Sequence, residues 1–255
     1  MQDIVIKSIP KAKVMQLSLN RPRQRNALSN EMIASLARML EEEWDSDEVR
    51  CCILVGADNV FSAGADIKEM EADGITAINN VERKKNWRII EQFPKPMIAV
   101  VEGYAFGGGH ELALVADIIV AAEDARFGQP EINLGILPGD GATQRLTRVA
   151  GKSLAMEMML SGDPITAQTA QAAGLVSCVV PPGDALEKAL DLATGIAQKS
   201  PIAVRLVKTA IKSAYETSLS AGLDVERQAI QQAFAEGSHV EPMRRFLNKK
   251  EPVKS

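Results

Sequence analysis

Short apolar runs separated by turn residues recur along most of the chain. The segments IVIKSI and KVMQLSL alternate apolar with polar residues, which predicts two strands. CCILVG at 51–56 and PMIAVVEG at 96–103 are unbroken apolar runs, as expected for strands buried on both faces of a sheet. DIIVAAE at 117–123 predicts a further strand.

Helical spacing appears between these runs. An amphipathic helix is predicted after Ser29, from the apolar positions Met32, Ile33, Leu36, Leu40 and Trp44. A polar stretch at 75–92 and the apolar segment after the glycines at 107–109 are also compatible with helices. Because strand and helix alternate, the pattern predicts an α/β fold with parallel strands and right-handed crossovers.

The C-terminal part is dominated by predicted helices, with one more strand at LVSCVV. Pro201 directly after Ser200 favours a new helix, because proline in the first turn loses no hydrogen bond that it needed. We therefore expect a core of residues 1–199 and a C-terminal helical region of residues 200–255.

Composition narrows the class of protein. The chain has 255 residues, 46% of them apolar, and a net charge of −4, which argues against nucleic acid as a partner. No apolar run approaches the ~18 residues of a membrane span, and the first residues do not form a secretory signal. The three cysteines provide no disulfide framework, so we expect a soluble protein of the reducing cytoplasm.

Several common site motifs are missing from the sequence. His110 and His239 are its only histidines, and no two cysteines have the spacing of metal ligands, which argues against a zinc site. GKS at 151–153 is not part of a phosphate-binding loop, because Leu146 occupies the position of the required glycine. Neither G-x-G-x-x-G nor G-x-S-x-G occurs, which argues against dinucleotide binding and against a serine hydrolase of that type.

Two glycine-containing turns follow predicted buried strands. GYAFGGGHELAL at 103–114 runs from three consecutive glycines into a helix, and FSAGADIKEM at 61–70 precedes another helix start. The N-terminus of a helix presents unpaired N–H groups, and glycine lets a ligand approach that backbone closely. Two such loops could form an oxyanion hole. Alternatively, the glycines only permit close packing of helix against strand.

Two glutamates lie in apolar surroundings. Glu111 falls just inside the apolar helix, and Glu131 lies between Pro130 and Ile132. If the two carboxyl groups share a dry cleft, mutual repulsion raises one pKa and leaves a proton donor beside an acceptor. The competing interpretation is that each is a capping or surface side chain.

Taken together, these motifs resemble the enoyl-CoA hydratase (crotonase) family. NRPRQRNALS, FSAGADIKEM, GYAFGGGHELAL, FGQPEINLGILPGDGATQRL and GKSLAMEMMLSGDPITAQTAQAAGLV follow the family pattern in order, from about Leu19 to Val176. The resemblance implies a crotonase-type spiral of ββα units. It also implies C-terminal helices that support a homotrimer or homohexamer and cover the active site.

The resemblance also implies specific site residues. The carbonyl of a coenzyme A thioester would be held between the backbone N–H groups of Ala65 and Gly108. Glu111 would orient and activate the attacking water, and Glu131 would transfer a proton at Cα. Gly139 matches a position whose backbone lies beside that water.

Further positions match the family's contacts to coenzyme A. We expect these contacts from Arg23, Gln24, Arg25, Ala27, Asp66, Ile67, Phe246 and Lys249. For the loop arginines, solvated surface charge is the alternative explanation. No metal and no separate cofactor are implied, since coenzyme A is part of the substrate.

The chain departs from the family pattern at three places. Asp140 stands where a small apolar residue is common, so it either points to solvent or raises the pKa of a neighbouring carboxyl group. Ala142 replaces a common glycine, which would be costly if the position needs a positive φ. His110 stands where a smaller residue is frequent; its side chain could serve packing or contact a residue of the site, and we favour packing.

The expected activity is hydration of a 2-enoyl-CoA to a 3-hydroxyacyl-CoA in the breakdown of fatty or aromatic acids. The pattern also resembles members that act on dehydroadipyl-CoA, whose distal carboxylate Arg83, Lys84 and Lys85 could meet if they are not simply a solvated helix face. The acyl pocket is expected along residues 71–87. The alternatives are isomerisation, thioester hydrolysis, or a non-catalytic homologue that binds acyl-CoA or RNA.

Overall fold

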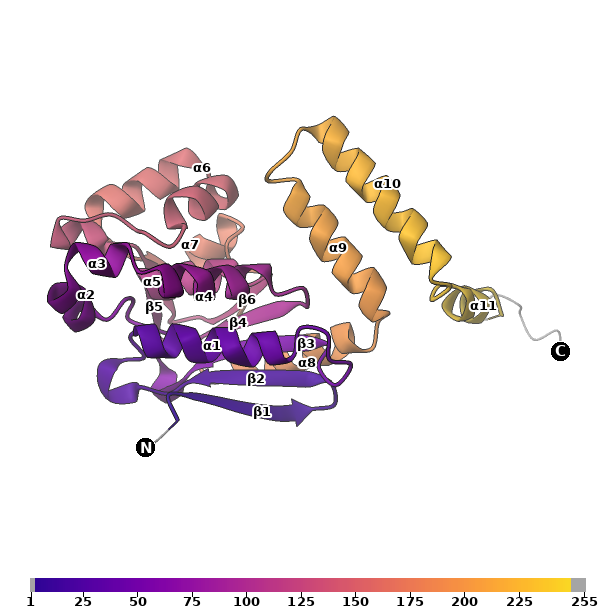
Figure 1. Cartoon of the computed structure of the whole chain (residues 1–255), viewed down its shortest axis with the longest axis horizontal. Coiled ribbons are helices and arrows are strands. Elements are labelled where there is room, and N and C mark those ends of the chain that lie inside the picture. The colour runs from indigo at the N-terminus through magenta and orange to yellow at the C-terminus, as the bar shows by residue number, and fades with distance from the viewer. Residues whose placement is uncertain (1–2, 249–255) are drawn as a thin grey trace. The chain divides into compact units, whose positions relative to one another are not determined.

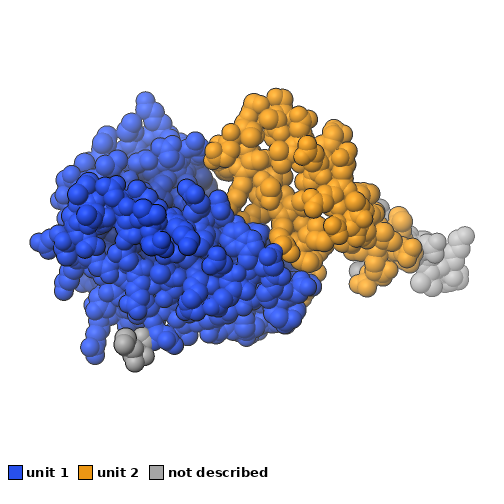
Figure 2. Space-filling model, in the orientation of Figure 1, with its two compact units in different colours: residues 1–197 blue, residues 198–255 orange. Residues whose placement is uncertain are grey.

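The computed structural model describes residues 3–248. The chain forms two compact units, residues 1–197 and residues 198–255, which are coloured separately in Figure 2. The strands among the described residues all belong to the first unit: β1 (Val5–Lys11), β2 (Val14–Leu19), β3 (Cys51–Gly56), β4 (Met97–Val101), β5 (Tyr104–Phe106), β6 (Ile118–Ala122), β7 (Arg126–Gly128), β8 (Ile165–Thr166) and β9 (Cys178–Val180).

Helices connect and cover these strands. The first unit contains α1 (Asn30–Glu42), α2 (Ile67–Asp73), α3 (Ile75–Ile78), α4 (Val81–Gln92), α5 (Gly108–Val115), α6 (Ala142–Ser161), α7 (Ala167–Ala172) and α8 (Ala185–Ala197). Three short 3-10 helices are η1 (Pro22–Gln24), η2 (Ala57–Asn59) and η3 (Pro130–Leu134). The second unit contains α9 (Pro201–Ser213), α10 (Leu219–Ala235) and α11 (Val240–Asn248).

The main sheet has the strand order β1-β2-β3-β4-β6-β9. Strands β2, β3, β4, β6 and β9 are parallel, as the alternation of strand and helix predicts, and β1 pairs with β2 in the antiparallel sense. Figure 1 shows α1 and α4 across one face of this sheet. Helix α8 packs against the other face, so the central strands are covered on both sides.

Strand β3 shows why its sequence is apolar throughout. Cys52 and Leu54 point into the larger apolar core with α1 and α4, whereas Cys51 and Ile53 point into the second core with α8. Successive side chains of a strand face opposite sides, so a strand buried on both faces needs an apolar residue at every position. The prediction of strands buried on both faces is confirmed.

A second, smaller sheet of order β5-β7-β8 was not predicted. Strand β5 pairs with β7 in parallel, and β7 pairs with β8 in the antiparallel sense. Its strands are only two or three residues long, which is too short for a clear alternating pattern. This sheet places the start of α5 and the start of η3 beside each other, because the N–H of Gly107 donates to the carbonyl of Gly128 at 3.0 Å.

Two serines begin helices where the sequence predicts. The Ser29 hydroxyl accepts from the Met32 N–H at 3.2 Å and begins α1. The Ser200 hydroxyl accepts from the Ala203 N–H at 3.3 Å and begins α9, with Pro201 in its first turn. Within the second unit, α9 and α10 pack against each other.

Candidate active site

The glycines at 107–109 lie where β5 ends and α5 begins. Gly107 has φ 51° and ψ −128°, a conformation that side chains disfavour strongly. A Cβ on Gly109 would lie 2.6 Å from both the Cβ and the carbonyl oxygen of Ser62. The glycines therefore serve a backbone turn as well as a close approach between α5 and the 61–66 segment.

Two backbone amides meet at this approach. A Cβ on Gly108 would lie 3.4 Å from the nitrogen of Ala65, and a Cβ on Gly64 would lie 3.5 Å from the nitrogen of Gly108. Among the residues that the structure describes, neither the Ala65 N–H nor the Gly108 N–H donates a hydrogen bond. The Gly108 N–H is also one of the unpaired donors at the start of a helix. This pair of neighbouring donors can receive one carbonyl or enolate oxygen.

Glu111 lies in the first turn of α5, and only 2% of its surface is exposed. Its Oε1 accepts from the backbone N–H groups of Asp140 at 2.8 Å and Ala142 at 2.9 Å. Burial raises the pKa of Glu111 to about 7, and the charges of Asp140 and Glu131 act in the same direction. Near neutral pH this carboxyl group can therefore either give or take a proton.

Glu131 lies in η3 and comes close to the glycine turn. A Cβ on Gly107 would lie 2.6 Å from its Oε1. Burial raises the pKa of Glu131, and the charge of Asp140 raises it further. The two glutamates thus face the same region around the start of α5, and each sits in an environment that favours its protonated form.

Gln129 contacts Glu131, and His110 in turn contacts Gln129. The orientation that gives both polar atoms of the Gln129 amide a partner directs its nitrogen to Glu131, at 3.2 Å and 3.1 Å from the two carboxyl oxygens. The amide oxygen then faces Nδ1 of His110 at 3.2 Å, and this nitrogen must carry the proton. Burial lowers the pKa of His110 to about 4, so its ring is neutral and fixes the orientation of the amide.

His110 therefore does more than the packing that we expected from the sequence. Its ring packs against Phe127, with the ring centroids 5.5 Å apart, and it also orients Gln129. The sequence reasoning missed Gln129 altogether. Its only signal is a polar residue placed two positions before Glu131 in an otherwise apolar stretch.

The loop before α6 settles the other two departures from the family pattern. Ala142 is the first residue of α6, and the positive φ of 114° falls on Gly141 instead, so alanine carries no strain at 142. Asp140 does not point freely to solvent, since its Oδ2 pairs with Arg83 at 3.2 Å. Gly139 is exposed, and a Cβ there would meet nothing within 4 Å.

Arg83 is less exposed than the neighbouring lysines of α4. Its side chain is 15% exposed, whereas Lys84 and Lys85 lie at the surface of α4. At the far end of the segment expected to line the acyl pocket, Trp87 is 4% exposed and belongs to the core. The large exposed apolar residues of this region lie earlier, at Ile75, Ile78 and Val81.

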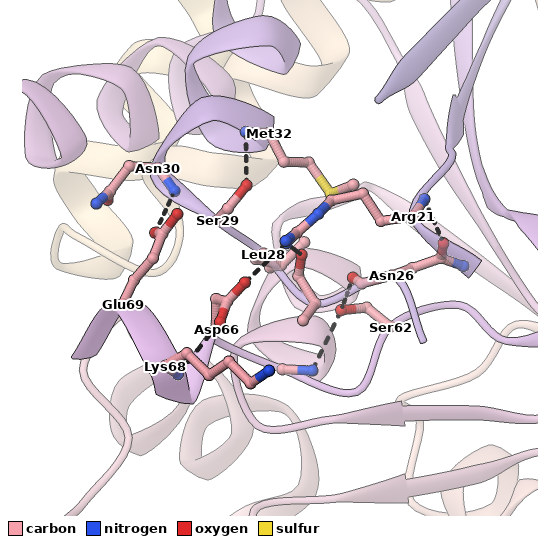
Figure 3. Close-up of polar contacts among 12 residues, drawn as sticks. Arg21, Asn26, Leu28, Ser29, Asn30, Met32, Ser62, Asp66, Lys68 and Glu69 are labelled. Carbon is pink, nitrogen blue, oxygen red and sulfur yellow. Dashed lines mark hydrogen bonds and ion pairs between the residues drawn. The ribbon is translucent and has the colours of Figure 1, made fainter. Parts of the chain in front are cut away.

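The loop expected to contact coenzyme A is anchored by residues that were not predicted. Figure 3 shows Arg21 facing Asp66, and the two form an ion pair at 2.9 Å. Asn26 is fully buried, and its amide nitrogen donates to the carbonyl groups of Ala57 and Val60. These contacts fix the loop through its buried side, and three neighbouring side chains remain exposed at the surface. These are Arg23, Gln24 and Arg25.

The remaining expected contacts differ in their surroundings. Ala27 is half-buried, and Ile67, the first residue of α2, is 49% exposed. Asp66 caps α2 by accepting from the Lys68 N–H at 3.2 Å. In the second unit, Phe246 of α11 is 60% exposed, and Lys249 lies outside the described residues.

Residues 3–248 contain neither a metal-binding cluster nor a helix that could span a membrane. No group of three or more histidine, cysteine, aspartate or glutamate side chains in that range could hold a metal ion. None of the helices in the same range has both the length and the apolar character needed to cross a membrane.

The pKa of Glu111 leads to a prediction about stability. The native pKa of about 7 exceeds the ordinary value of 4.5, so the native state binds more protons than the unfolded state between these values. The free energy of unfolding must therefore fall as pH rises through this window, by on the order of 3 kcal/mol at most. Glu111→Gln removes the buried charge while keeping an oxygen for both N–H donors.

We expect Glu111→Gln to unfold at a higher temperature than the wild type at about pH 8, and the advantage to shrink towards pH 5. Thermal unfolding across this range measures it. Glu157→Gln, on the exposed surface of α6, serves as the control and should leave the pH dependence unchanged. A pH-independent difference between Glu111→Gln and wild type would contradict the raised pKa.

Comparison with known proteins identifies the family of the chain. Residues 10–254 match the enoyl-CoA hydratase/isomerase family. The chain is 47% identical to the 2,3-dehydroadipyl-CoA hydratase of Escherichia coli (strain K12), over 94% of each chain. It is 44% identical to the mitochondrial enoyl-CoA hydratase of Pongo abelii, over 92% of this chain and 81% of that protein.

Solved structures give the same result for the fold. The enoyl-CoA hydratase from Bacillus anthracis superposes with a TM-score of 0.91 at 38% identity, over 98% of both chains. One from Geobacillus kaustophilus superposes with a TM-score of 0.93 at 37% identity, over 99% of this chain and 98% of that one. The family match over residues 10–254, the identities to enoyl-CoA hydratases and the shared fold together show that this chain belongs to the enoyl-CoA hydratase/isomerase family.

Proposed function

We propose that this protein is an enoyl-CoA hydratase, which adds water across the Cα=Cβ bond of a 2-enoyl-CoA to give a 3-hydroxyacyl-CoA. The observation that carries the proposal is the placement of Glu111, in the first turn of α5, and of Glu131, beside Gly107, near the amides of Ala65 and Gly108. The reaction needs a base at Cβ, an acid at Cα and a stabilised thioester oxygen, and these four groups can supply all three.

The proposed steps follow from the positions of the groups. The thioester oxygen accepts from the N–H groups of Ala65 and Gly108, which stabilise the enolate that forms as water adds. Removal of one such donor costs about 2.7–4 kcal/mol of transition-state stabilisation in a comparable oxyanion hole. Glu111 takes a proton from water as its oxygen bonds to Cβ, and Glu131 delivers a proton to Cα, so that one water molecule is added in total.

Within this proposal, Gln129 and Gly139 support the two glutamates. Gln129 holds the carboxylate of Glu131 through its amide nitrogen, and this interaction limits the orientations of the acid. Gly139 has open space where a side chain would point, which suits a backbone beside the water. No metal or separate cofactor enters these steps, and we propose that none is used.

Two carboxyl groups favour hydration over other chemistry of the family. Double-bond isomerisation moves a single proton between carbons and can proceed with one carboxylate. Hydration must both activate a water molecule and protonate Cα, so it uses two groups. Thioester hydrolysis would release a free thiol. A role in RNA binding fits poorly with the net charge of −4.

Product analysis tests the proposal. Incubation with a 2-enoyl-CoA in ¹⁸O-labelled water should give 3-hydroxyacyl-CoA that carries the label at C3, with loss of the absorbance of the conjugated thioester. A shifted double bond without label would indicate an isomerase, and thiol release would indicate a hydrolase. Turnover of none of the short, long and dicarboxylic enoyl-CoA substrates would overturn the proposal.

The dicarboxylic substrates belong in this set because of the Escherichia coli relative, which is named for 2,3-dehydroadipyl-CoA. We propose a substrate of this kind as the first to test. For the coenzyme A part, the candidates are the exposed loop side chains of Arg23, Gln24 and Arg25, the backbone of Ala27, and Asp66 and Ile67. Phe246 and Lys249 remain candidates from the C-terminal region.

We further propose that the protein assembles as a homotrimer or homohexamer in the cytoplasm. The helices of the second unit expose large apolar side chains, which in an isolated unit would face water. These include Val207, Ile211, Leu223, Ile230, Phe234 and Phe246. Light scattering after size-exclusion chromatography should give three or six times the mass of 27.5 kDa, and a monomer would contradict the proposal.

A further inference from the structure

Asp140 connects three parts of the site through separate groups. Its backbone N–H donates to Oε1 of Glu111 at 2.8 Å. Its backbone carbonyl accepts from Nη1 of Arg145 at 2.8 Å, and its carboxylate pairs with Arg83 at 3.2 Å. The residue is therefore fixed at its N–H, its carbonyl and its side chain at the same time.

The two arginines are themselves held in place. Nη1 of Arg83 also lies within donating distance of the Leu28 carbonyl, at 3.4 Å, and of Oδ1 of Asn30, at 3.5 Å. Nη2 of Arg145 pairs with Glu91 of α4 at 2.6 Å. Since Arg83 lies on α4 and Arg145 on α6, the loop that carries Asp140 is tied to both helices.

Gly141 makes the approach of Arg145 possible. A Cβ at Gly141 would overlap the guanidinium group of Arg145, and its φ of 114° is itself in the region that favours glycine. The glycine thus has a packing reason as well as a conformational one. It lets the guanidinium group lie across the turn and bond the carbonyl of Asp140.

Charged groups from four elements face this carboxylate. Arg83 and Glu91 come from α4, Arg145 from α6, Glu111 from α5, and Glu131 from η3. Burial raises the pKa of Asp140, and the cation of Arg83 opposes that rise. The negative charge of Asp140 in turn raises the pKa of Glu111 and of Glu131.

The ion pair is sheltered enough for its charges to matter. The side chain of Arg83 is 15% exposed and that of Asp140 is 27% exposed. Pairs at the open surface are strongly screened by water, but partly buried charges interact over several ångströms with a much lower effective dielectric constant. A change at either member should therefore be felt at the two glutamates.

On this basis we propose that Asp140, held by Arg83 and Arg145, is a positioning residue that fixes Glu111 through its N–H and sets the protonation range of both glutamates through its charge. The inference rests on the proposed hydratase function and deepens it. Asp140 acts through Glu111 and Glu131 and is not itself given a contact to the substrate. Arg83, with Asp140 as its partner, is accordingly assigned to the enzyme's own electrostatics.

Opposite charge changes at the two members should shift the pH profile in opposite directions. Asp140→Asn removes a negative charge, which lowers the pKa of Glu111. The acidic limb of the kcat/KM profile, which Glu111 sets as the base, should therefore move to lower pH by about one pH unit. Arg83→Gln removes a positive charge, so the same limb should move to higher pH by a similar amount. The double variant loses both charges, and its limb should return close to that of the wild type.

The controls separate charge from structure. Asp140→Glu keeps the charge and should keep the limb near its wild-type position. Arg88→Gln removes an exposed cation from the same helix as Arg83 and should leave the profile unchanged. A purely structural role would lower kcat in both single variants without shifts of opposite sign, and the double variant would then be the least active.

Each result bears on one hypothesis. Shifts of opposite sign that cancel in the double variant support the inference, and unchanged limbs or shifts of the same sign overturn it. If Asp140→Asn does not fold, Arg83→Gln alone must still move the limb upward. Absence of hydration by the wild type would instead overturn the proposed function, so the two failures are distinguishable.

Discussion

Glu131→Gln and Glu111→Gln should each lower kcat for hydration by roughly 10²–10⁴-fold, the usual contribution of a general acid or base. Glutamine has nearly the same shape as glutamate but can neither take a proton from water nor deliver one to Cα. Since the amides of Ala65 and Gly108 remain in place, binding of the thioester should change little. Steady-state kinetics and a binding titration with a 3-hydroxyacyl-CoA measure the two quantities.

Glu157→Gln is a suitable control, because this glutamate lies exposed on α6. Thermal unfolding should show that the two site variants remain folded, and Glu111→Gln should be the more stable protein at about pH 8. Full activity in both site variants would contradict the mechanism. Loss of binding together with activity would instead indicate that the glutamates hold the substrate.

Gly107→Ala should reduce both the stability of the protein and its activity. The backbone conformation of Gly107, at φ 51° and ψ −128°, costs a side-chain-bearing residue about 1–3 kcal/mol. In addition, the new Cβ would lie 2.6 Å from Oε1 of Glu131, so the carboxylate must move away from the amides. We expect the unfolding temperature to fall by several degrees and kcat by at least about tenfold.

Gly74→Ala is a closely matched control. Gly74 has almost the same backbone conformation, at φ 53° and ψ −130°, but a Cβ there would meet nothing within 4 Å. It should therefore reproduce the strain without the loss of kcat for a short enoyl thioester. An equal loss of kcat in both variants would show that the contact with Glu131 is not what matters at Gly107.

Much of the fold could be predicted because its signals are local. The apolar runs of β3 and β4 are complete within five or six residues, and Ser29 and Ser200 cap helices through bonds that span three residues. The glycine turn before α5 belongs to the same class. A pattern of this kind is present in any window of the sequence that contains the element.

The second sheet and several site contacts carry no such signal. Strand β8 consists of Ile165 and Thr166, and it exists because β7 lies beside it. The pairing of Arg83 with Asp140 spans 57 residues, so no local pattern in the sequence reveals it. For the same reason the sequence suggested that Arg83 belongs to a solvated helix face, although its side chain is only 15% exposed.

The sequence by itself determined which residues could carry the chemistry: two glutamates in apolar surroundings and two glycine turns after buried strands. It also determined the family, since motifs in a fixed order are a property of the chain. Only the tertiary structure decided which carboxyl group is buried, which amides lie together and which charges face one another. These depend on distances between residues far apart in sequence, and both the pKa of Glu111 and the role of Asp140 follow from such distances.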